Sequence, residues 1–206
     1  MSFVQYAQDW VKSEPLPVRK NRALRVDRFL KREFPKARIA LKYGTNIQLL
    51  VAVILSAQCT DKKVNEVTEK LFKKYKTAGD FASANTAEFE KEIRPTGFYR
   101  NKAKNIIGAC KIIQEKFKGK LPKTMAEILT LPGVARKTAN VVLGNAYGIA
   151  EGIAVDTHMI RINQKLGFTA NSDPVKIEND LMVSIPKKDW FGYTYRIIEY
   201  GRNVCP

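Results

Sequence analysis

Apolar residues recur along most of this chain at the three- and four-residue spacing that marks one face of a helix. The segment 102–117 shows this spacing over three turns, and residues 49–55 are apolar on every side, as in a central buried helix. No segment shows the sustained period-two alternation of a half-buried strand. The pattern predicts an all-α fold, with further helices near residues 1–15, 18–34, 61–72, 86–93, 157–166, 174–181 and 188–200.

Side chains that can accept a bond from a free backbone N–H mark the start of several predicted helices. Thr60 or Asp61, Thr86 and Thr157 are the expected N-caps of three of them. Before the helix near 174–181, Asp173 precedes a proline, a residue that is favoured at the first helical position.

A tight turn near Pro132 joins two further helices. The first begins at Thr124, and Glu127 follows at the spacing of a capping box. It must end before the proline, because the residue preceding a proline is pushed out of the helical region. Gly133 supplies the positive φ that a tight turn often needs. The segment 124–147 is therefore predicted to be a helix–hairpin–helix. The first helix is expected to bury Met125, Ile128 and Leu129.

The start of the second helix combines an anion site with a lysine. The first N–H groups of a helix have no intrahelical acceptor, which favours a phosphate there. Lys137 lies in this first turn, where the helix dipole disfavours a cation, so the position suits an amine that gives up its charge. A lysine at a helix start is usually only solvated. Here the chain returns after one short helix to Asp156, whose carboxylate is then expected to face Lys137 across a cleft.

Four segments resemble one known family. Residues 131–144 (LPGVARKTANVVLG) and 154–162 (AVDTHMIRI) resemble the helix–hairpin–helix and Gly/Pro–Asp region of the endonuclease III family of DNA glycosylases. Residues 54–61 (ILSAQCTD) and 96–103 (TGFYRNKA) resemble two further family segments in the expected order. The similarity runs from about Asn46 to Cys205. Ala135 departs from the pattern, since the family's hairpin more often has a second glycine there.

The resemblance implies a bifunctional DNA N-glycosylase and AP lyase of base excision repair that acts on oxidised pyrimidines. Lys137 would attack the sugar, form a Schiff base and cut the strand by β-elimination, with Asp156 as the second catalytic residue. The alternatives are a sibling glycosylase of other base specificity and a non-catalytic helix–hairpin–helix module. The adenine-removing branch usually carries a glutamate near Gln58 and lacks the lysine. The DNA-binding residues implied are Gln58, Phe98, Gly133, Val134, Ala135, Arg136 and Thr138.

Two of these residues are implied to be wedges that enter the base stack as the damaged nucleotide leaves. From its own context, Gln58 could equally well only form a hydrogen bond within a loop. Phe98 could instead fill the core. His158, the only histidine, is expected to be structural, and it excludes a metal site built on several histidines.

Net charge points to a polyanionic partner. The chain has 36 Lys and Arg against 20 Asp and Glu, a formal charge of +16, although a merely soluble basic protein could have the same excess. Basic residues surround an apolar stripe of Val26, Phe29, Leu30 and Phe34, on a surface that either faces DNA or is simply solvated. We expect a monomer that binds double-stranded DNA with damaged or abasic sites.

Cysteine usage and the apolar runs bear on location and cofactor. Three cysteines without CxxC spacing do not favour disulfides. With no secretion signal and no apolar run long enough to span a bilayer, we expect a cytoplasmic protein beside chromosomal DNA. Cys205 is similar to the first of four family ligands of a [4Fe–4S] cluster, and the other three are absent. We expect no cofactor in the chain as given, which is then truncated or incomplete, and a cluster only if the native protein continues past Pro206.

The family also implies two helical lobes, with DNA and the extruded base in the cleft between them. Residues 45–154 are expected to form a central helical-barrel lobe that contains the hairpin. Residues 1–44 and 155–206 are expected to combine into a terminal lobe.

Overall fold

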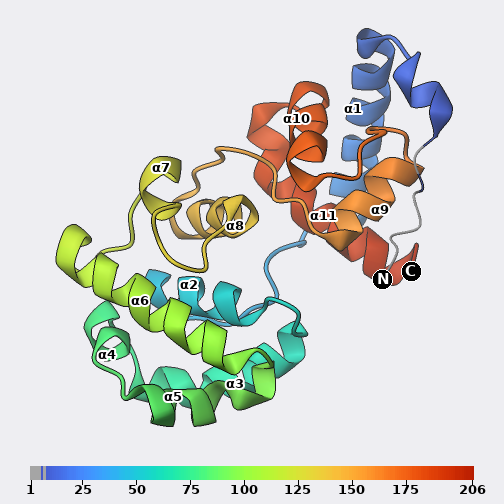
Figure 1. The fold of residues 1–206 in the computed structure, drawn as a ribbon. Coiled ribbons are helices and arrows are strands. Elements are labelled where there is room, and N and C mark those ends of the chain that lie inside the picture. Colours follow the sequence, from blue (N-terminus) through green and yellow to red (C-terminus); the bar gives the residue numbers. More distant parts are fainter. Residues whose placement is uncertain (1–5, 7) are drawn as a thin grey trace. The chain divides into compact units, whose positions relative to one another are not determined.

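The computed structural model describes residue 6 and residues 8–206, and every regular element among these residues is a helix (Figure 1). The predicted all-α class is confirmed. The chain forms two compact units, Ala40–Ile149 and Met1–Ile39 with Ala150–Pro206, here called the central unit and the terminal unit. Their assignment to two lobes that hold DNA stays a prediction. Among the described residues, no helix is long and apolar enough to cross a bilayer.

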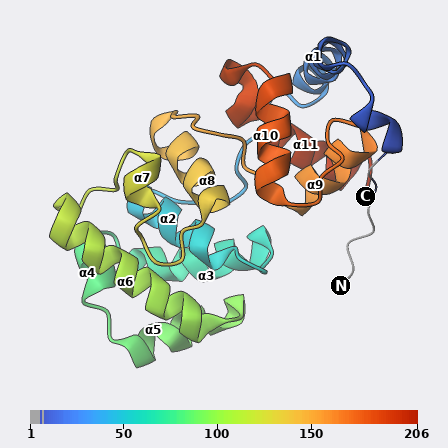
Figure 2. The same ribbon diagram turned by 45° about the horizontal axis from the view of Figure 1, so that its top comes forward.

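Helix α2 is the centre of the central unit (Figure 2). Thr45 caps it by accepting a bond from the Gln48 N–H at 3.2 Å, and every residue from 47 to 55 is buried. Helices α3, α6 and α8 pack against α2, which explains why its sequence is apolar on every side. The helices of this unit are α2 (Asn46–Leu55), α3 (Asp61–Lys74), α4 (Ala78–Ala82), α5 (Thr86–Ile93), η2 (Arg94–Thr96), α6 (Tyr99–Phe117), α7 (Met125–Ile128) and α8 (Arg136–Tyr147).

Capping in the central unit follows the sequence with small corrections. Thr60 caps α3 as predicted. Helix α5 is capped by Asn85 rather than Thr86, since the asparagine oxygen accepts from the Glu88 N–H at 3.1 Å. Thr124 caps α7, but its hydroxyl also donates to the Glu127 carboxylate at 2.8 Å, so the reciprocal bond of a capping box is replaced by a side-chain bond.

The terminal unit packs helices from both ends of the chain. Helix α1 contacts α10 and α11, and α11 contacts α9. Asp27 of α1 is buried and pairs with Arg196 of α11 at 2.9 Å, which joins segments 169 residues apart. The helix expected near residues 1–15 lies partly outside the described residues. The elements of this unit are η1 (Asp9–Lys12), α1 (Leu16–Glu33), α9 (Thr157–Lys165), α10 (Pro174–Ser184), η3 (Lys187–Asp189) and α11 (Trp190–Asn203).

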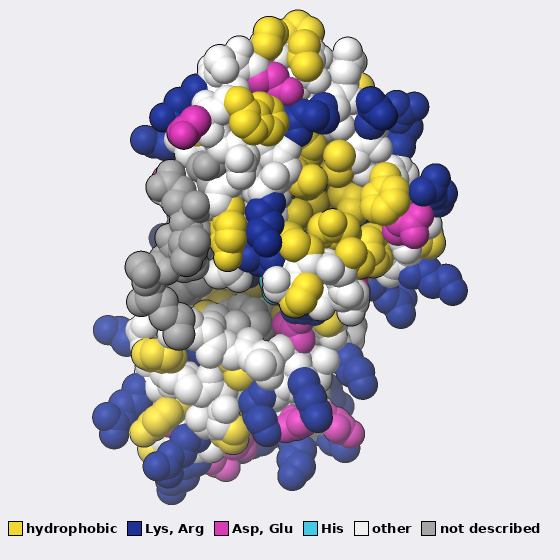
Figure 3. Space-filling view, turned by 90° about the vertical axis from the view of Figure 1, so that its right-hand side faces the viewer, with side chains coloured by type: hydrophobic (Ala, Val, Ile, Leu, Met, Phe, Trp, Pro, Cys, Tyr) yellow, Lys and Arg dark blue, Asp and Glu magenta, His cyan; other side chains and the backbone are white. Residues whose placement is uncertain are grey.

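The surface of α1 differs from the predicted stripe. Leu30 is buried, whereas Phe29 is 43% exposed, because the buried face runs through Ala23 and Asp27 instead. Arg22 is not a free DNA contact, since it pairs with Glu14 at 2.8 Å and donates to the Gly167 carbonyl at 2.7 Å. Figure 3 shows hydrophobic side chains gathered in one area of the face in view, with lysine and arginine beside them. The terminal unit has an open groove lined by Val26, Phe29, Leu30, Leu166, Ile197 and Tyr200, with Arg22 and Arg25.

Candidate active site

The hairpin between α7 and α8 has the predicted conformation. Gly133 has φ of 76°, and a Cβ atom there would lie 2.8 Å from the Cβ of Asn105 on α6. Both the backbone and the available space therefore require a glycine. Pro132 also lies close to α6, because a Cβ added to Gly108 would be 3.2 Å from its Cγ. The hairpin is thus held against α6 within the central unit.

The five hairpin residues predicted to bind DNA differ in what they expose. The Val134 side chain is buried, and its N–H donates to the Leu131 carbonyl at 3.2 Å, so Val134 shapes the turn from inside. Ala135 is exposed and is the N-cap residue of α8, with φ of −92°. A negative φ needs no glycine, which explains how the chain accommodates alanine here. Gly133 is exposed, whereas Arg136 and Thr138 are half-buried.

Lys137 lies in the first turn of α8, and its side chain is exposed. No acidic residue occupies that first turn. The lysine therefore stands beside helix N–H groups that favour a phosphate. The Lys137 amine is accessible to a nucleic-acid strand whose phosphate binds these N–H groups.

Asp156 is the N-cap of α9 and is half-buried. Its carboxylate accepts a bond from the Met159 N–H at 2.8 Å. The prediction that Thr157 caps this helix is wrong by one residue. Aspartate is a stronger cap than threonine, and here it precedes a residue that is already helical. Asp156 thus has a structural function in addition to the catalytic role implied for it. Lys137 belongs to the central unit and Asp156 to the terminal unit.

The two residues implied to be wedges share an unusual backbone. Gln58, with φ of 53°, follows α2, and Phe98, with φ of 47°, precedes α6. The left-handed region costs an L-residue roughly 1–2 kcal/mol, and such strain concentrates at functional sites. Among the described residues, Lys118 is the other non-glycine with positive φ, and it only ends α6.

Both of these side chains point to solvent rather than to the core. Phe98 is 68% exposed, so the alternative that it fills the core is wrong. Gln58 is exposed, and within the described part of the chain its side chain has no hydrogen bond that would hold it to a loop. Gly97, just before Phe98, has φ of 71° and ψ of 161°, a combination that essentially only glycine adopts. The backbone therefore presents both side chains outward.

Two further candidate residues, His158 and Cys205, lie in the terminal unit. His158, as predicted, packs within the terminal unit: its Nδ1 lies 3.5 Å from Arg161, and a Cβ on Gly201 would approach it to 2.9 Å. The Sγ of Cys205 lies 3.6 Å from both Arg161 Nη1 and Lys165 Nζ. Among the described residues, no three His, Cys, Asp or Glu side chains form a group that could hold a metal ion.

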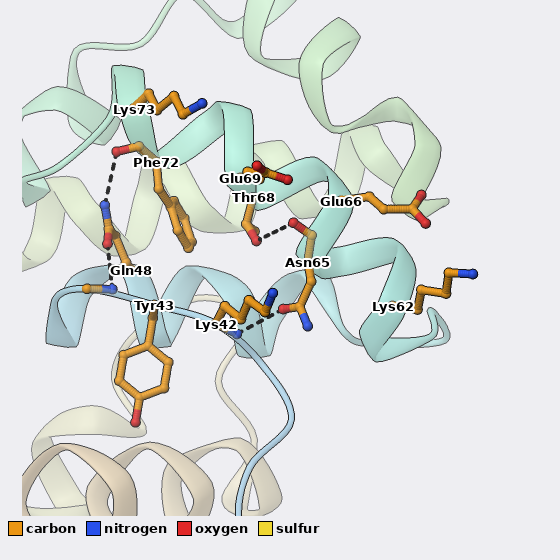
Figure 4. A pocket seen from close by; sticks show the side chains of 11 residues that line it. Lys42, Tyr43, Gln48, Lys62, Asn65, Glu66, Thr68, Glu69, Phe72 and Lys73 are labelled. Carbon is orange, nitrogen blue, oxygen red and sulfur yellow. Dashed lines mark hydrogen bonds between the residues drawn. The ribbon is translucent and has the colours of Figure 1, made fainter.

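An open pocket of the central unit lies elsewhere. Figure 4 shows it between residues 42–48 and α3, surrounded by positively charged lysine and negatively charged glutamate side chains. None of the predicted site residues is among those that line it. Its mixed charges and open shape do not single out a ligand.

Sequence reasoning missed Lys102. This lysine is 4% exposed and lies on the buried face of α6, where its ammonium donates to the backbone carbonyls of the last residues of α2 and η2. The sequence did indicate its burial: Lys102 lies four residues before Ile106, so both fall on the same, apolar face of the helix.

The all-helical fold and the hairpin on α6 define a class of DNA repair protein. Residues 51–187 match the model of the HhH-GPD superfamily of base excision DNA repair proteins. Endonuclease III of Synechocystis sp. is 54% identical over 187 residues, which is 91% of this chain and 85% of that protein. Endonuclease III of Bacillus subtilis is 45% identical over 173 residues, 84% and 78% of the two chains. This chain belongs to the endonuclease III family of that superfamily.

Solved structures agree with this assignment. A trapped endonuclease III–DNA covalent intermediate superposes with a TM-score of 0.86 at 41% identity, over 91% of this chain and 88% of that one. A thermostable thymine-DNA glycosylase superposes with a TM-score of 0.79 at 18% identity, over 90% and 88% of the chains, and shares only the fold.

Proposed function

We propose that this protein is a bifunctional DNA N-glycosylase and AP lyase of base excision repair, with oxidised pyrimidines as substrates and Lys137 as its nucleophile. Membership of the endonuclease III family supports the activity, and a solved relative at 41% identity is a trapped covalent intermediate with DNA. The observation that carries the lysine assignment is an exposed amine in the first turn of α8, beside the hairpin. Double-stranded DNA with a damaged or abasic site is the partner, and the protein acts beside chromosomal DNA.

The chemistry follows from an amine that meets an extruded nucleotide. A base stacked in a duplex must leave the stack before its sugar can be reached. The neutral Lys137 amine attacks C1′, the new N–C1′ bond replaces the glycosidic bond, and the base leaves with the electron pair and takes up a proton. The sugar ring opens to a protonated imine. Loss of a C2′ proton then expels the 3′ phosphate, and hydrolysis of the imine releases Lys137.

The other site residues support this sequence of steps. The Asp156 carboxylate stabilises positive charge at the sugar and moves protons to and from the reacting atoms. The N–H groups at the start of α8 bind a backbone phosphate, which fixes the strand. Gln58 and Phe98 fill the space that the extruded nucleotide leaves, as exposed side chains on strained loops can.

The alternatives are less well supported. A non-catalytic module needs the hairpin but neither Lys137 nor Asp156, and this chain has both. The adenine-removing branch is disfavoured because Gln58 and Lys137 stand where that branch has a glutamate and lacks a lysine.

Covalent trapping tests the proposal. Borohydride reduces an imine, so the wild-type protein is expected to become cross-linked to a duplex that contains one oxidised pyrimidine. Lys137→Gln removes the nucleophile and is expected to abolish trapping while DNA binding remains. Lys116→Gln is the matched control, because Lys116 is an exposed lysine in the last turn of α6. Undiminished trapping by Lys137→Gln would rule out this nucleophile, and a panel of duplexes with single defined lesions tests the substrate class.

The residues present do not fit an iron–sulfur cluster. A [4Fe–4S] cluster is held by four thiolates, and the 206-residue chain has three cysteines. Burial raises the pKa of the Cys110 thiol to about 12, which disfavours the thiolate. Cys59 belongs to the central unit and Cys205 to the terminal unit. The residues of this chain therefore do not by themselves supply the four thiolates of a cluster.

A further inference from the structure

Lys102 is a buried cation that the proposed chemistry does not use. It lies in the first turn of α6 and is 4% exposed. Burial lowers the pKa of its ammonium, while charge on the nearby Cys59 acts in the opposite direction. No carboxylate is among the groups that act on Lys102. A cation kept in the core with carbonyl partners alone needs a reason, because long charged side chains are rarely buried without an ion pair.

The two partners of the Lys102 ammonium identify that reason. Its Nζ donates to the Leu55 carbonyl at 2.8 Å and to the Thr96 carbonyl at 2.7 Å. Leu55 is the last residue of α2, three residues before Gln58. Thr96 is two residues before Phe98. One ammonium therefore binds the last helical residue before each strained loop, the Gln58 loop (residues 56–60) and the Phe98 loop (residues 97–98).

The backbone of Lys102 completes the connection to Phe98. The Phe98 carbonyl accepts the Lys102 N–H at 3.0 Å, and Phe98 is the N-cap residue of α6. Thr96 is itself fixed, since its hydroxyl donates to the Ile93 carbonyl at 2.8 Å and its side chain is buried. An ammonium has three donors, so it can bind two carbonyls at once where a single hydroxyl could bind only one.

We infer that Lys102 is a positioning residue that clamps the Gln58 loop to the Phe98 loop, so that the two wedges enter the base stack as one unit. The inference rests on the wedge roles in the proposed function. Its consequence is that the two loops act together: a wedge that moved independently would fill the space of the extruded nucleotide only part of the time. Lys102 does not touch DNA in this mechanism and acts only through the two loops.

Lys102→Met tests the clamp, because methionine keeps an unbranched apolar stem and removes every donor. Gln48→Met is the matched control. Gln48 is also buried and lies near the opposite end of α2. Its Nε2 donates to the Phe72 carbonyl at 3.3 Å (Figure 4) and to the Tyr75 carbonyl at 3.2 Å. Lys102→Met loses two bonds between a side chain and the backbone, and Gln48→Met loses three, because the Gln48 Oε1 also accepts the Gly44 N–H at 2.9 Å. Only Lys102→Met loses the connection between the wedge loops.

The readout is base extrusion rather than stability. A duplex with 2-aminopurine beside one oxidised pyrimidine becomes more fluorescent when its bases unstack. We expect Lys102→Met to lose most of this signal and to slow single-turnover base release by about tenfold or more. Cutting of single-stranded abasic DNA, which needs no extrusion, should fall much less. Gln48→Met should keep both the signal and the rate. If Lys102→Met is too unstable to assay, Lys102→Gln, which keeps an amide donor, is expected to lose less of each.

The outcomes separate the two claims. A wild-type protein that neither releases a base nor becomes trapped on DNA refutes the proposed function. An active wild type whose Lys102→Met variant retains extrusion, or loses no more of it than Gln48→Met does, refutes the clamp. Equal losses on duplex and single-stranded substrates also contradict the clamp, because they would mean that Lys102 only supports folding.

Discussion

Asp156 has two roles that substitution can separate. Its carboxylate caps α9 through the Met159 N–H at 2.8 Å, and the proposed chemistry also uses it. Asparagine is as good an N-cap as aspartate, so Asp156→Asn should keep the cap and remove the charge. Alanine should remove both. Loss of an N-cap costs about 1 kcal/mol, which lowers the Tm of a chain this long by about 2–4 °C.

The expected results therefore differ between stability and activity. Asp156→Asn should melt close to the wild type and bind DNA with similar affinity. Both variants should release an oxidised pyrimidine about 10²-fold more slowly or worse, as for loss of a charge-stabilising or acid–base group. Differential scanning calorimetry and single-turnover glycosylase assays measure the two quantities.

A matched control exists in the same unit. Asp173 caps α10 by accepting the Lys176 N–H at 2.9 Å, and nothing assigns it to the chemistry. Asp173→Ala should lower the Tm as much as Asp156→Ala does while base release stays at the wild-type rate. An Asp156→Asn variant that unfolds, or that keeps full activity, would refute the separation of the two roles.

Three further outcomes are expected. Gly97→Ala should cost about 1–3 kcal/mol of stability in chemical denaturation and reduce base extrusion, because its φ of 71° and ψ of 161° suit glycine alone. Gly148→Ala is the control: at both glycines an added Cβ would have no atom within 4 Å, but Gly148 has the ordinary left-handed conformation. Gly148→Ala should reduce base extrusion little, and equal effects of the two substitutions on extrusion would contradict the prediction. Because the net charge is +16, log K for DNA should fall with log salt by about 0.9 per phosphate contacted, and a flat titration would exclude backbone contacts. Iron analysis after anaerobic purification should find no cluster in the 206-residue chain, and about four irons per chain would overturn that expectation.

Local sequence patterns predicted the helices well and their first residues less well. The apolar run 49–55 could only be a buried helix, and it is one. The caps of α5 and α9 were each assigned one residue late, because two residues able to cap a helix stand side by side at both places. Leu129 was assigned to the buried face of α7 but is 41% exposed, since that helix ends after four residues and has no room for a longer stripe.

Local sequence patterns could not predict contacts between residues far apart in the chain. The partners of Lys102 include a carbonyl 47 residues away, and no spacing rule connects them. The left-handed backbone at Gln58 and Phe98 was equally hidden, because neither residue type favours that region. By contrast, the positive φ of Gly133 was predicted, because glycine adopts positive φ without a steric penalty and is favoured where a tight turn needs it.

The terminal unit can be completed only after the rest of the chain has been synthesised. Ala23 and Leu30 of α1 share one core with Met159, Phe168 and Tyr193. The intervening Ala40–Ile149 segment is contiguous and holds its own buried helix, α2. During translation α1 therefore leaves the ribosome before its packing partners in residues 150–206 have been synthesised, and its apolar face stays exposed to solvent until then. Closing a loop of this length costs little more entropy than closing a shorter one, but contacts so far apart in sequence form slowly, so we expect docking of α1 to be a slow step in folding.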